Sequence, residues 1–244
     1  GIYGGDPKRL SVASVLPRFV ELEAKYGSLT RGVLRSRRKA AKQARGVPLF
    51  QTLKGGLGQL VSVLEERAKP SVVHGVAETV ERSGSAYRVR VGSEWIDAEH
   101  VVLACQAYEA GELLETLDGE LARLLAGVQY SSSITVSIGY EKRTLGHPLK
   151  GFGFLVPKRE RRTMMACTWV ANKFSYRVPD HLAVLRCFAG GEDGVPLEES
   201  DEAIVRAMRD DLRHIMGVTA EPLFARVARW PRSMAQYTVG HAAR

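Results

Sequence analysis

Residues 134–140 alternate strictly between apolar and polar side chains. The apolar members of this alternation are Ile134, Val136, Ile138 and Tyr140. A pattern of period two is typical of a β-strand that buries one face and leaves the other open. Further strands are predicted over residues 152–156, 164–169 and 182–188. The second half of the chain is therefore expected to build a sheet with an apolar face that another element must cover.

A helix suited to cover this face is predicted to begin at Ser200. This serine is a favourable N-cap residue, and Asp201 and Glu202 follow it in the first turn, where acidic side chains stabilise a helix. The apolar stripe of the helix consists of Ile204, Met208, Leu212 and Ile215. Gly217 is expected to end the helix.

The first half of the chain mixes helices with shorter strands. A helix is expected between Pro17 and Gly27, with Phe19, Leu22 and Tyr26 on one face. A second amphipathic helix is expected through Leu60, Val63 and Leu64.

After Pro70 the pattern changes to period two, and short strands are predicted over residues 72–80, 87–91 and 95–96. The run Val101–Ala104 predicts a strand that is buried on both faces, and a helix from about Tyr108 to Leu114 follows it. The fold class is therefore α+β or α/β.

The composition excludes several classes of protein. With 45% hydrophobic and 25% charged residues over 244 positions, the chain is typical of a globular protein. No apolar run approaches the roughly 20 residues that span a bilayer. Cys105, Cys167 and Cys187 lack the spacing of a disulfide framework or a zinc site, so we expect buried thiols in a reducing compartment. No metal site is predicted.

The net charge of +8 is concentrated in one stretch. Its cations are Arg35, Arg37, Arg38, Lys39, Lys42 and Arg45. They are expected on a helix that begins near Ser28, as a solvated helix face. A nucleic-acid partner is not expected, because no aromatic residues alternate with these cations to stack bases. A contact with an anionic membrane surface stays open.

Motifs of known enzyme chemistry are missing from the sequence. Gly55-Gly56-Leu57-Gly58 lacks the spacing of a nucleotide-binding fingerprint and is predicted to form a tight turn. The chain contains no Ser-His-Asp order, no nucleophile elbow and no zinc-protease motif. The residues alone therefore identify no catalytic acid or base.

Several short strings, taken in their order and spacing, carry a family resemblance. They are Gly1-Ile2-Tyr3-Gly4-Gly5-Asp6-Pro7, Leu53-Lys54-Gly55-Gly56-Leu57, Gly151-Phe152-Gly153-Phe154-Leu155-Val156-Pro157, Cys167-Thr168-Trp169, Arg186-Cys187-Phe188-Ala189-Gly190-Gly191, Glu221-Pro222, Trp230-Pro231 and Gln236-Tyr237-Thr238-Val239-Gly240-His241. Together they resemble the protoporphyrinogen oxidases, flavoproteins of haem synthesis. The resemblance covers essentially the whole chain.

The resemblance implies part of a two-domain, flavin-containing, amine-oxidase-like fold, with half of an FAD-binding domain and a mixed-sheet substrate domain. Residues 1–48 and 129–244 are expected in the substrate domain, and residues 49–128 in the FAD-binding domain. In the family, the glycine fingerprint for the flavin diphosphate precedes the position of Gly1, and a second flavin-binding segment follows that of Arg244. The isolated chain is accordingly expected to bind flavin weakly and to be inactive.

The resemblance also implies the substrate-binding residues. The family holds a flat tetrapyrrole between apolar side chains, and Leu155 and Thr168 match positions on one face of it. Phe188 matches the stacking position on the other face, Phe152 lies in the same motif as Leu155, and Gly1 matches a glycine whose backbone approaches the reacting ring. The strand pattern alone favours another interpretation, in which Phe152, Leu155 and Phe188 are ordinary strand core.

The implied cofactor is FAD, with Val73 matching a backbone contact to the adenine end and Ala242 matching a position near the flavin. The implied reaction removes six electrons from a porphyrinogen, with oxygen reoxidising the flavin. The cofactor performs this chemistry, which agrees with the lack of a recognisable catalytic residue. A cytoplasmic protein is expected. Peripheral contact with the inner face of the cell membrane and a homodimer stay open.

Three functions of different classes remain at this point. The first is a fragment of an oxidase that acts on protoporphyrinogen IX, with coproporphyrinogen III, which differs in its carboxylates, as the alternative substrate. The second is a module that binds a porphyrin or a partner without turnover. The third, a nucleic-acid binder that uses the basic run, ranks last.

Overall fold

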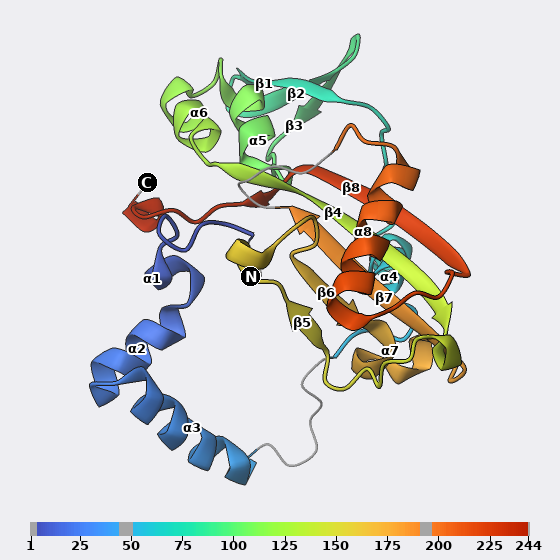
Figure 1. The fold of residues 1–244 in the computed structure, drawn as a ribbon. Coiled ribbons are helices and arrows are strands. Elements are labelled where there is room, and N and C mark those ends of the chain that lie inside the picture. The colour runs from blue at the N-terminus through green and yellow to red at the C-terminus, as the bar shows by residue number, and fades with distance from the viewer. Residues whose placement is uncertain (1–3, 44–50, 191–196, 244) are drawn as a thin grey trace. The chain divides into compact units, whose positions relative to one another are not determined.

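The computed structural model describes residues 4–43, 51–190 and 197–243, and it divides the chain into two compact units. Unit 1 consists of Gly1–Leu29 and Tyr130–Ala243, and unit 2 of Thr30–Gln129 (Figure 1). The assignment of flavin and substrate binding to parts of the chain stays a prediction. None of the helices in the described ranges combines the length and the apolar character that a membrane crossing requires.

Unit 1 begins with two short helices, α1 (Val12–Val15) and α2 (Pro17–Tyr26). Pro17 opens α2, and Gly27 ends it in the left-handed conformation at a φ of 68°, as the sequence predicts. The chain continues into α3 (Leu29–Gln43), which belongs to unit 2 from Thr30 on and contains most of the basic run. Arg35 is exposed on this helix, whereas Arg45 lies outside the described residues.

A five-stranded antiparallel sheet forms the centre of unit 1 (Figure 1). Its strands are β4 (Tyr130–Glu141), β5 (Gly153–Leu155), β6 (Ala166–Trp169), β7 (Leu182–Gly190) and β8 (Phe224–Ala235), in the order β5-β6-β7-β4-β8. Short helical segments lie between these strands, namely η1 (Lys142–Thr144), η2 (Lys158–Glu160), α7 (Val170–Lys173) and η3 (Ser175–Arg177), and η4 (His241–Ala243) follows β8. All described strand pairs are antiparallel, where a mixed sheet was expected.

One face of this sheet is covered by α8 (Asp201–Met216), which crosses it in Figure 1. Ser200 caps the helix by accepting a hydrogen bond from Ala203 N at 3.2 Å, as predicted. The core combines the alternating residues of β4 with the stripe of α8, namely Ile134, Val136, Ile138, Tyr140, Ile204, Met208 and Leu212. Ile215 was expected in the stripe but is 41% exposed, and in the last turn of the helix the neighbouring Met216 packs against the core instead.

The long strand β8 is not predicted by the sequence pattern. Its residues Phe224–Ala235 include three arginines and Pro231, which weaken the alternation and resemble a loop. Because β8 is an edge strand, its outer side needs no hydrogen-bond donors, so a proline is tolerated there.

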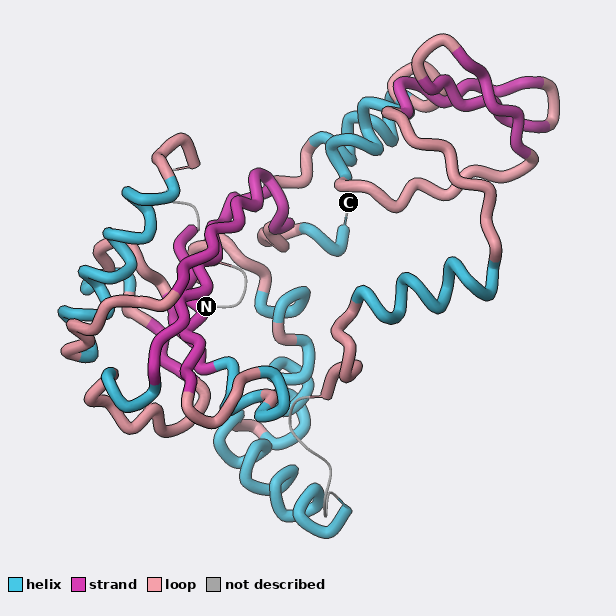
Figure 2. Tube along the Cα trace, turned by 90° about the vertical axis from the view of Figure 1, so that its right-hand side faces the viewer, coloured by secondary structure: helices cyan, strands magenta, loops and turns pink. Residues whose placement is uncertain are grey.

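Unit 2 contains a three-stranded antiparallel sheet in the order β1-β2-β3. Its elements are α4 (Gly58–Ala68), β1 (Ala77–Ser83), β2 (Ala86–Val91), β3 (Glu94–Ala98), α5 (Ala107–Leu114) and α6 (Gly119–Ala126). In the tube view the three strands lie side by side (Figure 2). Gly56 lies in a tight turn, at a φ of 83°, directly before α4, as expected.

Two predictions for unit 2 are wrong. Residues 72–76 form no strand, so β1 begins only at Ala77. The run Val101–Ala104 is not a strand and is not buried on both faces, since Val102 is 88% exposed. A buried strand requires hydrogen-bonding neighbours, and no described strand pairs with either segment.

Candidate functional site

The sheet face opposite α8 carries side chains from neighbouring strands that point in one direction. Phe188 on β7 lies opposite both Thr135 on β4 and Ala166 on β6. Ala166 in turn lies opposite Leu155 on β5. Directly opposed residues of an antiparallel sheet share a face, so these four side chains form a continuous row. The same alternation that sends Ile134 into the core sends Thr135 to this open face.

A cavity of about 690 Å³ lies over this row. Its lining residues are Gly4, Ser131, Ser132, Ser133, Thr135, Leu155, Met165, Ala166, Phe188, Ala189, Trp230, Ser233 and Met234. None of these residues is acidic or basic. The cavity therefore has apolar and aromatic walls with a few hydroxyl groups, and its volume is typical of a small-molecule site.

Two of the five residues predicted to contact a tetrapyrrole line this cavity together. Leu155 is 67% exposed, and the half-buried Phe188 belongs to the open face and not to the core cluster. The interpretation of these two residues as strand core is therefore wrong. Their contact with a tetrapyrrole stays a prediction.

Two further predicted residues, Thr168 and Phe152, do not line the cavity. Thr168 lies on the same face of β6 but one pair further along, opposite Arg186. Phe152 precedes β5 and is 44% exposed. Gly1 lies outside the described residues.

Trp230 is the largest cavity residue that was not predicted individually. It lies opposite Ser133 in the sheet, and its indole Nε1 donates a hydrogen bond to Thr135 Oγ1 at 3.2 Å. Met165 and Met234 were also missed. The sequence offered one indication of Trp230, namely an aromatic residue beside Pro231. No strand was predicted around Trp230, so its place on the sheet could not be inferred.

The segment at the start of unit 1 contributes Gly4 to the cavity wall. The neighbouring Gly5 packs directly on the buried side chain of Gln236, where a Cβ atom would collide with Oε1. Gln236 is itself fixed by donating a hydrogen bond from Nε2 to Ser131 Oγ at 2.9 Å. A glycine at position 5 thus lets this segment lie against the sheet beside the cavity.

A buried carboxylate holds the β5–β6 side of the cavity on the core helix. Asp211 of α8 is 4% exposed, and its Oδ2 accepts hydrogen bonds from Thr163 N at 3.0 Å and Met164 N at 2.7 Å. The next two residues along the chain, Met165 and Ala166, both line the cavity. The hydrogen bonds of Asp211 therefore position this part of the wall.

Two thiols face each other on the core side of the sheet. Cys167 of β6 lies opposite Cys187 of β7, both are fully buried, and their sulfur atoms are 3.7 Å apart. Burial and the hydrogen bond with Cys187 raise the pKa of the Cys167 thiol well above its usual range. Cys105 is exposed, so the expectation of three buried thiols is wrong for this residue.

We expect iodoacetamide at pH 8 to alkylate Cys105 in the native protein and to leave Cys167 and Cys187 unmodified. Thiolates are the reacting species, and the two core thiols are both shielded and, at Cys167, resistant to ionisation. Peptide mass mapping before and after unfolding in guanidinium measures this. Rapid modification of Cys167 in the native protein would contradict the described packing.

The two residues predicted to contact the cofactor lie in different units. Val73 of unit 2 is 57% exposed and lies outside the strands, and no hydrogen bond of its backbone occurs within the described ranges. Ala242 of unit 1 is exposed in η4, shortly after Gly240. Each of the two residues is therefore exposed within its own unit.

Comparisons with known proteins identify similar sequences. The coproporphyrinogen III oxidase of Bacillus subtilis (strain 168) is 31% identical and aligns with 100% of this chain and 53% of its own length. The chloroplastic protoporphyrinogen oxidase 1 of Arabidopsis thaliana is 27% identical over 99% of this chain and 50% of its own length. The chain thus spans about half the length of the curated relatives it matches.

Solved structures share the fold. A crystal structure of the "Putative protoporphyrinogen oxidase" of Exiguobacterium sp. 255-15 matches 100% of this chain and 52% of its own chain, with a TM-score of 0.84 and 30% identity. The family model of the flavin containing amine oxidoreductases matches residues 1–244. The chain therefore belongs to the flavin containing amine oxidoreductase family.

Proposed function

We propose that this chain forms the substrate-binding part of an FAD-dependent porphyrinogen oxidase of haem synthesis that uses oxygen as electron acceptor. The observation that supports this best is the 690 Å³ cavity with uncharged, aromatic walls on the open sheet face. A large, flat, apolar macrocycle gains free energy from such walls and needs few polar partners. Phe188 and Trp230 supply the aromatic surfaces.

Coproporphyrinogen III is the substrate favoured by the relatives. The coproporphyrinogen III oxidases of Bacillus subtilis and Propionibacterium freudenreichii are 31% and 28% identical to this chain. The chloroplastic protoporphyrinogen oxidases of Arabidopsis thaliana and Oryza sativa are 27% and 24% identical. Protoporphyrinogen IX, which the sequence motifs favour, is the alternative substrate.

Each unit carries one exposed residue that is predicted to contact the flavin. In unit 2, the exposed Val73 fits a contact with the adenine ring. In unit 1, the exposed Ala242 fits a position beside the isoalloxazine. When bound, FAD supplies the acceptor for the hydrides that leave the porphyrinogen.

The residues of this chain bind, orient and shield the substrate. Phe188 provides a flat surface for stacking, and Leu155 and Met165 close the β5–β6 side of the cavity. The hydroxyl oxygen of Thr135 accepts a hydrogen bond from Trp230 Nε1. This hydrogen bond fixes the plane of the indole ring. None of the described residues that line this cavity is acidic or basic, so these residues orient the macrocycle and do not transfer its protons.

The direct test is turnover by the full-length, flavin-loaded protein. We expect oxygen uptake together with the appearance of porphyrin fluorescence when coproporphyrinogen III is added, and a lower kcat/KM with protoporphyrinogen IX. Tight porphyrin binding without oxygen uptake would favour the non-catalytic module. Neither binding nor turnover with either tetrapyrrole would contradict the proposal.

We expect Phe188→Ala to weaken porphyrin binding by at least about 10-fold, because the loss of roughly 100 Å² of apolar contact costs about 2 kcal/mol. Flavin affinity is expected to stay within about 3-fold, since a stacking surface for the macrocycle contributes little to the cofactor's own contacts. Porphyrin fluorescence titration and flavin release on dilution measure the two affinities.

Phe154→Ala is the matched control for Phe188→Ala. Phe154 is one residue before Leu155, on the core face of β5, where its ring packs on Trp169 with 5.8 Å between centroids. Its removal is expected to lower stability and to leave porphyrin affinity unchanged. An equal loss of porphyrin and flavin binding in Phe188→Ala would instead assign Phe188 a general structural role.

A further inference from the structure

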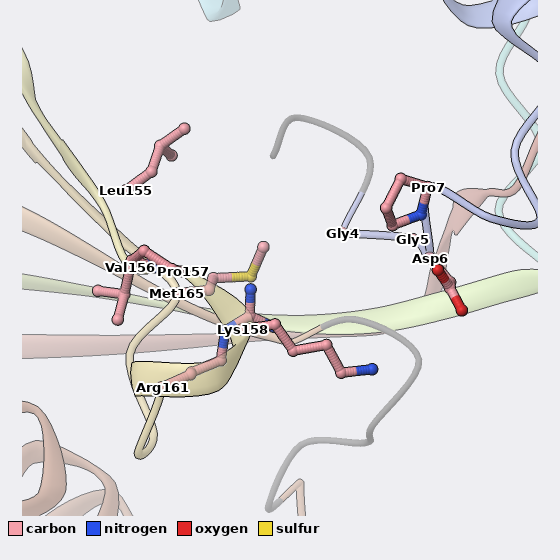
Figure 3. A pocket seen from close by; sticks show the side chains of 10 residues that line it. All are labelled: Gly4, Gly5, Asp6, Pro7, Leu155, Val156, Pro157, Lys158, Arg161 and Met165. Carbon is pink, nitrogen blue, oxygen red and sulfur yellow. The ribbon is translucent and has the colours of Figure 1, made fainter.

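A second cavity of about 280 Å³ adjoins the large one (Figure 3). It is lined by Gly4, Gly5, Asp6, Pro7, Leu155, Val156, Pro157, Lys158, Arg161 and Met165. Gly4, Leu155 and Met165 line both cavities. A ligand that fills the large cavity can therefore extend a substituent past these three residues into the small one.

The two cavities differ in charge. None of the described residues that line the large cavity is charged, whereas those of the small cavity include Lys158, Arg161 and Asp6. The carboxylate of Asp6 already accepts a hydrogen bond from the backbone of Lys8 at 2.9 Å. Among the described residues that line the small cavity, two are cationic and one is acidic, a composition that favours an anionic group.

The guanidinium of Arg161 has an unused donor at this position. Its Nε is buried, and no residue in the described ranges accepts a hydrogen bond from it. A buried donor without an acceptor is unfavourable, so an acceptor supplied by a ligand would be stabilising. The planar guanidinium matches the geometry of a carboxylate better than an ammonium does.

The local backbone explains why Arg161 occupies this place. Arg161 follows the short helical turn η2, and its N–H donates to Lys158 O at 3.3 Å. This turn lies in the β5–β6 connection, which Asp211 anchors on α8 two residues later, at Thr163. The adjacent Arg162 is exposed and lines neither cavity.

We propose that Arg161, assisted by Lys158, binds a carboxylate substituent of the tetrapyrrole whose macrocycle occupies the large cavity. This inference rests on the proposed function and adds a specificity-determining residue to it. The small cavity selects tetrapyrroles that carry a carboxylate on the edge facing Leu155 and Met165. The carboxylate gives Arg161 Nε an acceptor that no residue in the described ranges supplies.

The test compares two porphyrins with the full-length, flavin-loaded protein. Coproporphyrin III and its tetramethyl ester share the macrocycle, but only the first carries carboxylates. We expect Arg161→Gln to weaken coproporphyrin III binding by about 10-fold to 100-fold, the range for losing a charge-assisted hydrogen bond. The affinity for the ester is expected to change by less than about 3-fold. Fluorescence titration measures both affinities without turnover.

Two further variants separate the effect of Arg161 from general charge and folding. Arg162→Gln removes the same charge one residue away and is expected to leave both affinities unchanged. Arg161→Lys keeps the charge without the planar guanidinium and should recover part of the lost affinity. Equal losses in Arg161→Gln and Arg162→Gln, or an equal loss for acid and ester, would overturn the assignment of Arg161.

The outcome for the unaltered protein tests the proposed function separately. If the unaltered protein binds both porphyrins but Arg161→Gln does not change the affinity for coproporphyrin III, the proposed role of Arg161 is wrong. The proposal that the large cavity binds the macrocycle is then still supported. If the unaltered protein binds neither porphyrin, the proposed function fails, and the carboxylate site fails with it.

Discussion

Replacing Asp211 by alanine is expected to lower the free energy of unfolding by about 3 kcal/mol, because two buried charge-assisted hydrogen bonds are lost. The carboxylate accepts from Thr163 N and Met164 N, and Asp211 and Met164 are almost completely buried. Water cannot replace the lost acceptor without opening the core, so both N–H groups are left unsatisfied. Urea unfolding followed by circular dichroism measures the effect.

Asp210→Ala provides the matched comparison. Asp210 precedes Asp211 on the same helix, but its side chain is 53% exposed and pairs with an equally exposed Arg213 at 3.1 Å. An exposed pair of this kind contributes at most about 0.5 kcal/mol. Similar costs in the two variants would mean that the hydrogen bonds of Asp211 do not hold the β5–β6 connection on α8.

The loss of Asp211 should also affect binding. The chain that it anchors leads directly into Met165 and Ala166, which line the large cavity. We therefore expect weaker porphyrin binding in Asp211→Ala even under conditions in which the protein stays folded. Asp211 acts here as a positioning residue, since its carboxylate is on the core side of the sheet.

Gly153→Ala is expected to destabilise the protein by about 4 kcal/mol, as the sum of backbone strain and steric overlap. Gly153 has a φ of 142°, which side chains rarely adopt. An added Cβ would collide with the carbonyl oxygen of Cys167 and lie 2.7 Å from the Cα of Thr168. Cys167 cannot move away, because it is fully buried and paired with Cys187 in the sheet.

Gly151→Ala is the control for backbone strain alone. Gly151 also has a positive φ, of 72°, but no heavy atom lies within 4 Å of an added Cβ. The left-handed conformation costs an alanine about 1 kcal/mol. Thermal unfolding of both variants separates strain from collision, and an equal shift of the melting temperature would show that β5 tolerates the side chain.

The collision at Gly153 also bears on the site. Gly153 pairs with Thr168, and the same short strand ends at Leu155, which lines both cavities. If β5 separates from β6, Leu155 loses its position in the walls of the large and the small cavity. A glycine at position 153 is therefore required for the shape of the proposed site as well as for the sheet.

The sequence by itself determined the local elements wherever the pattern was strong. The alternation of residues 134–140 indicates a strand that is buried on one face. The apolar stripe from Ile204 to Leu212 likewise indicates a helix that is buried on one face, and these two faces pack together in one core. The end of α2 at Gly27 and the start of α8 at Ser200 follow from capping, which involves only neighbouring residues. The family, too, could be recognised from ordered sequence motifs.

Only the tertiary structure decided which side chains meet. Trp230 reaches Thr135 across 95 residues of chain, in a strand that the sequence pattern did not reveal. Phe152 lies next to β5 in the sequence but outside the cavity, whereas Arg161, which had no motif, lines the adjoining one. Strand order and register depend on hydrogen bonds and packing between distant segments, and local periodicity contains no information about these partners.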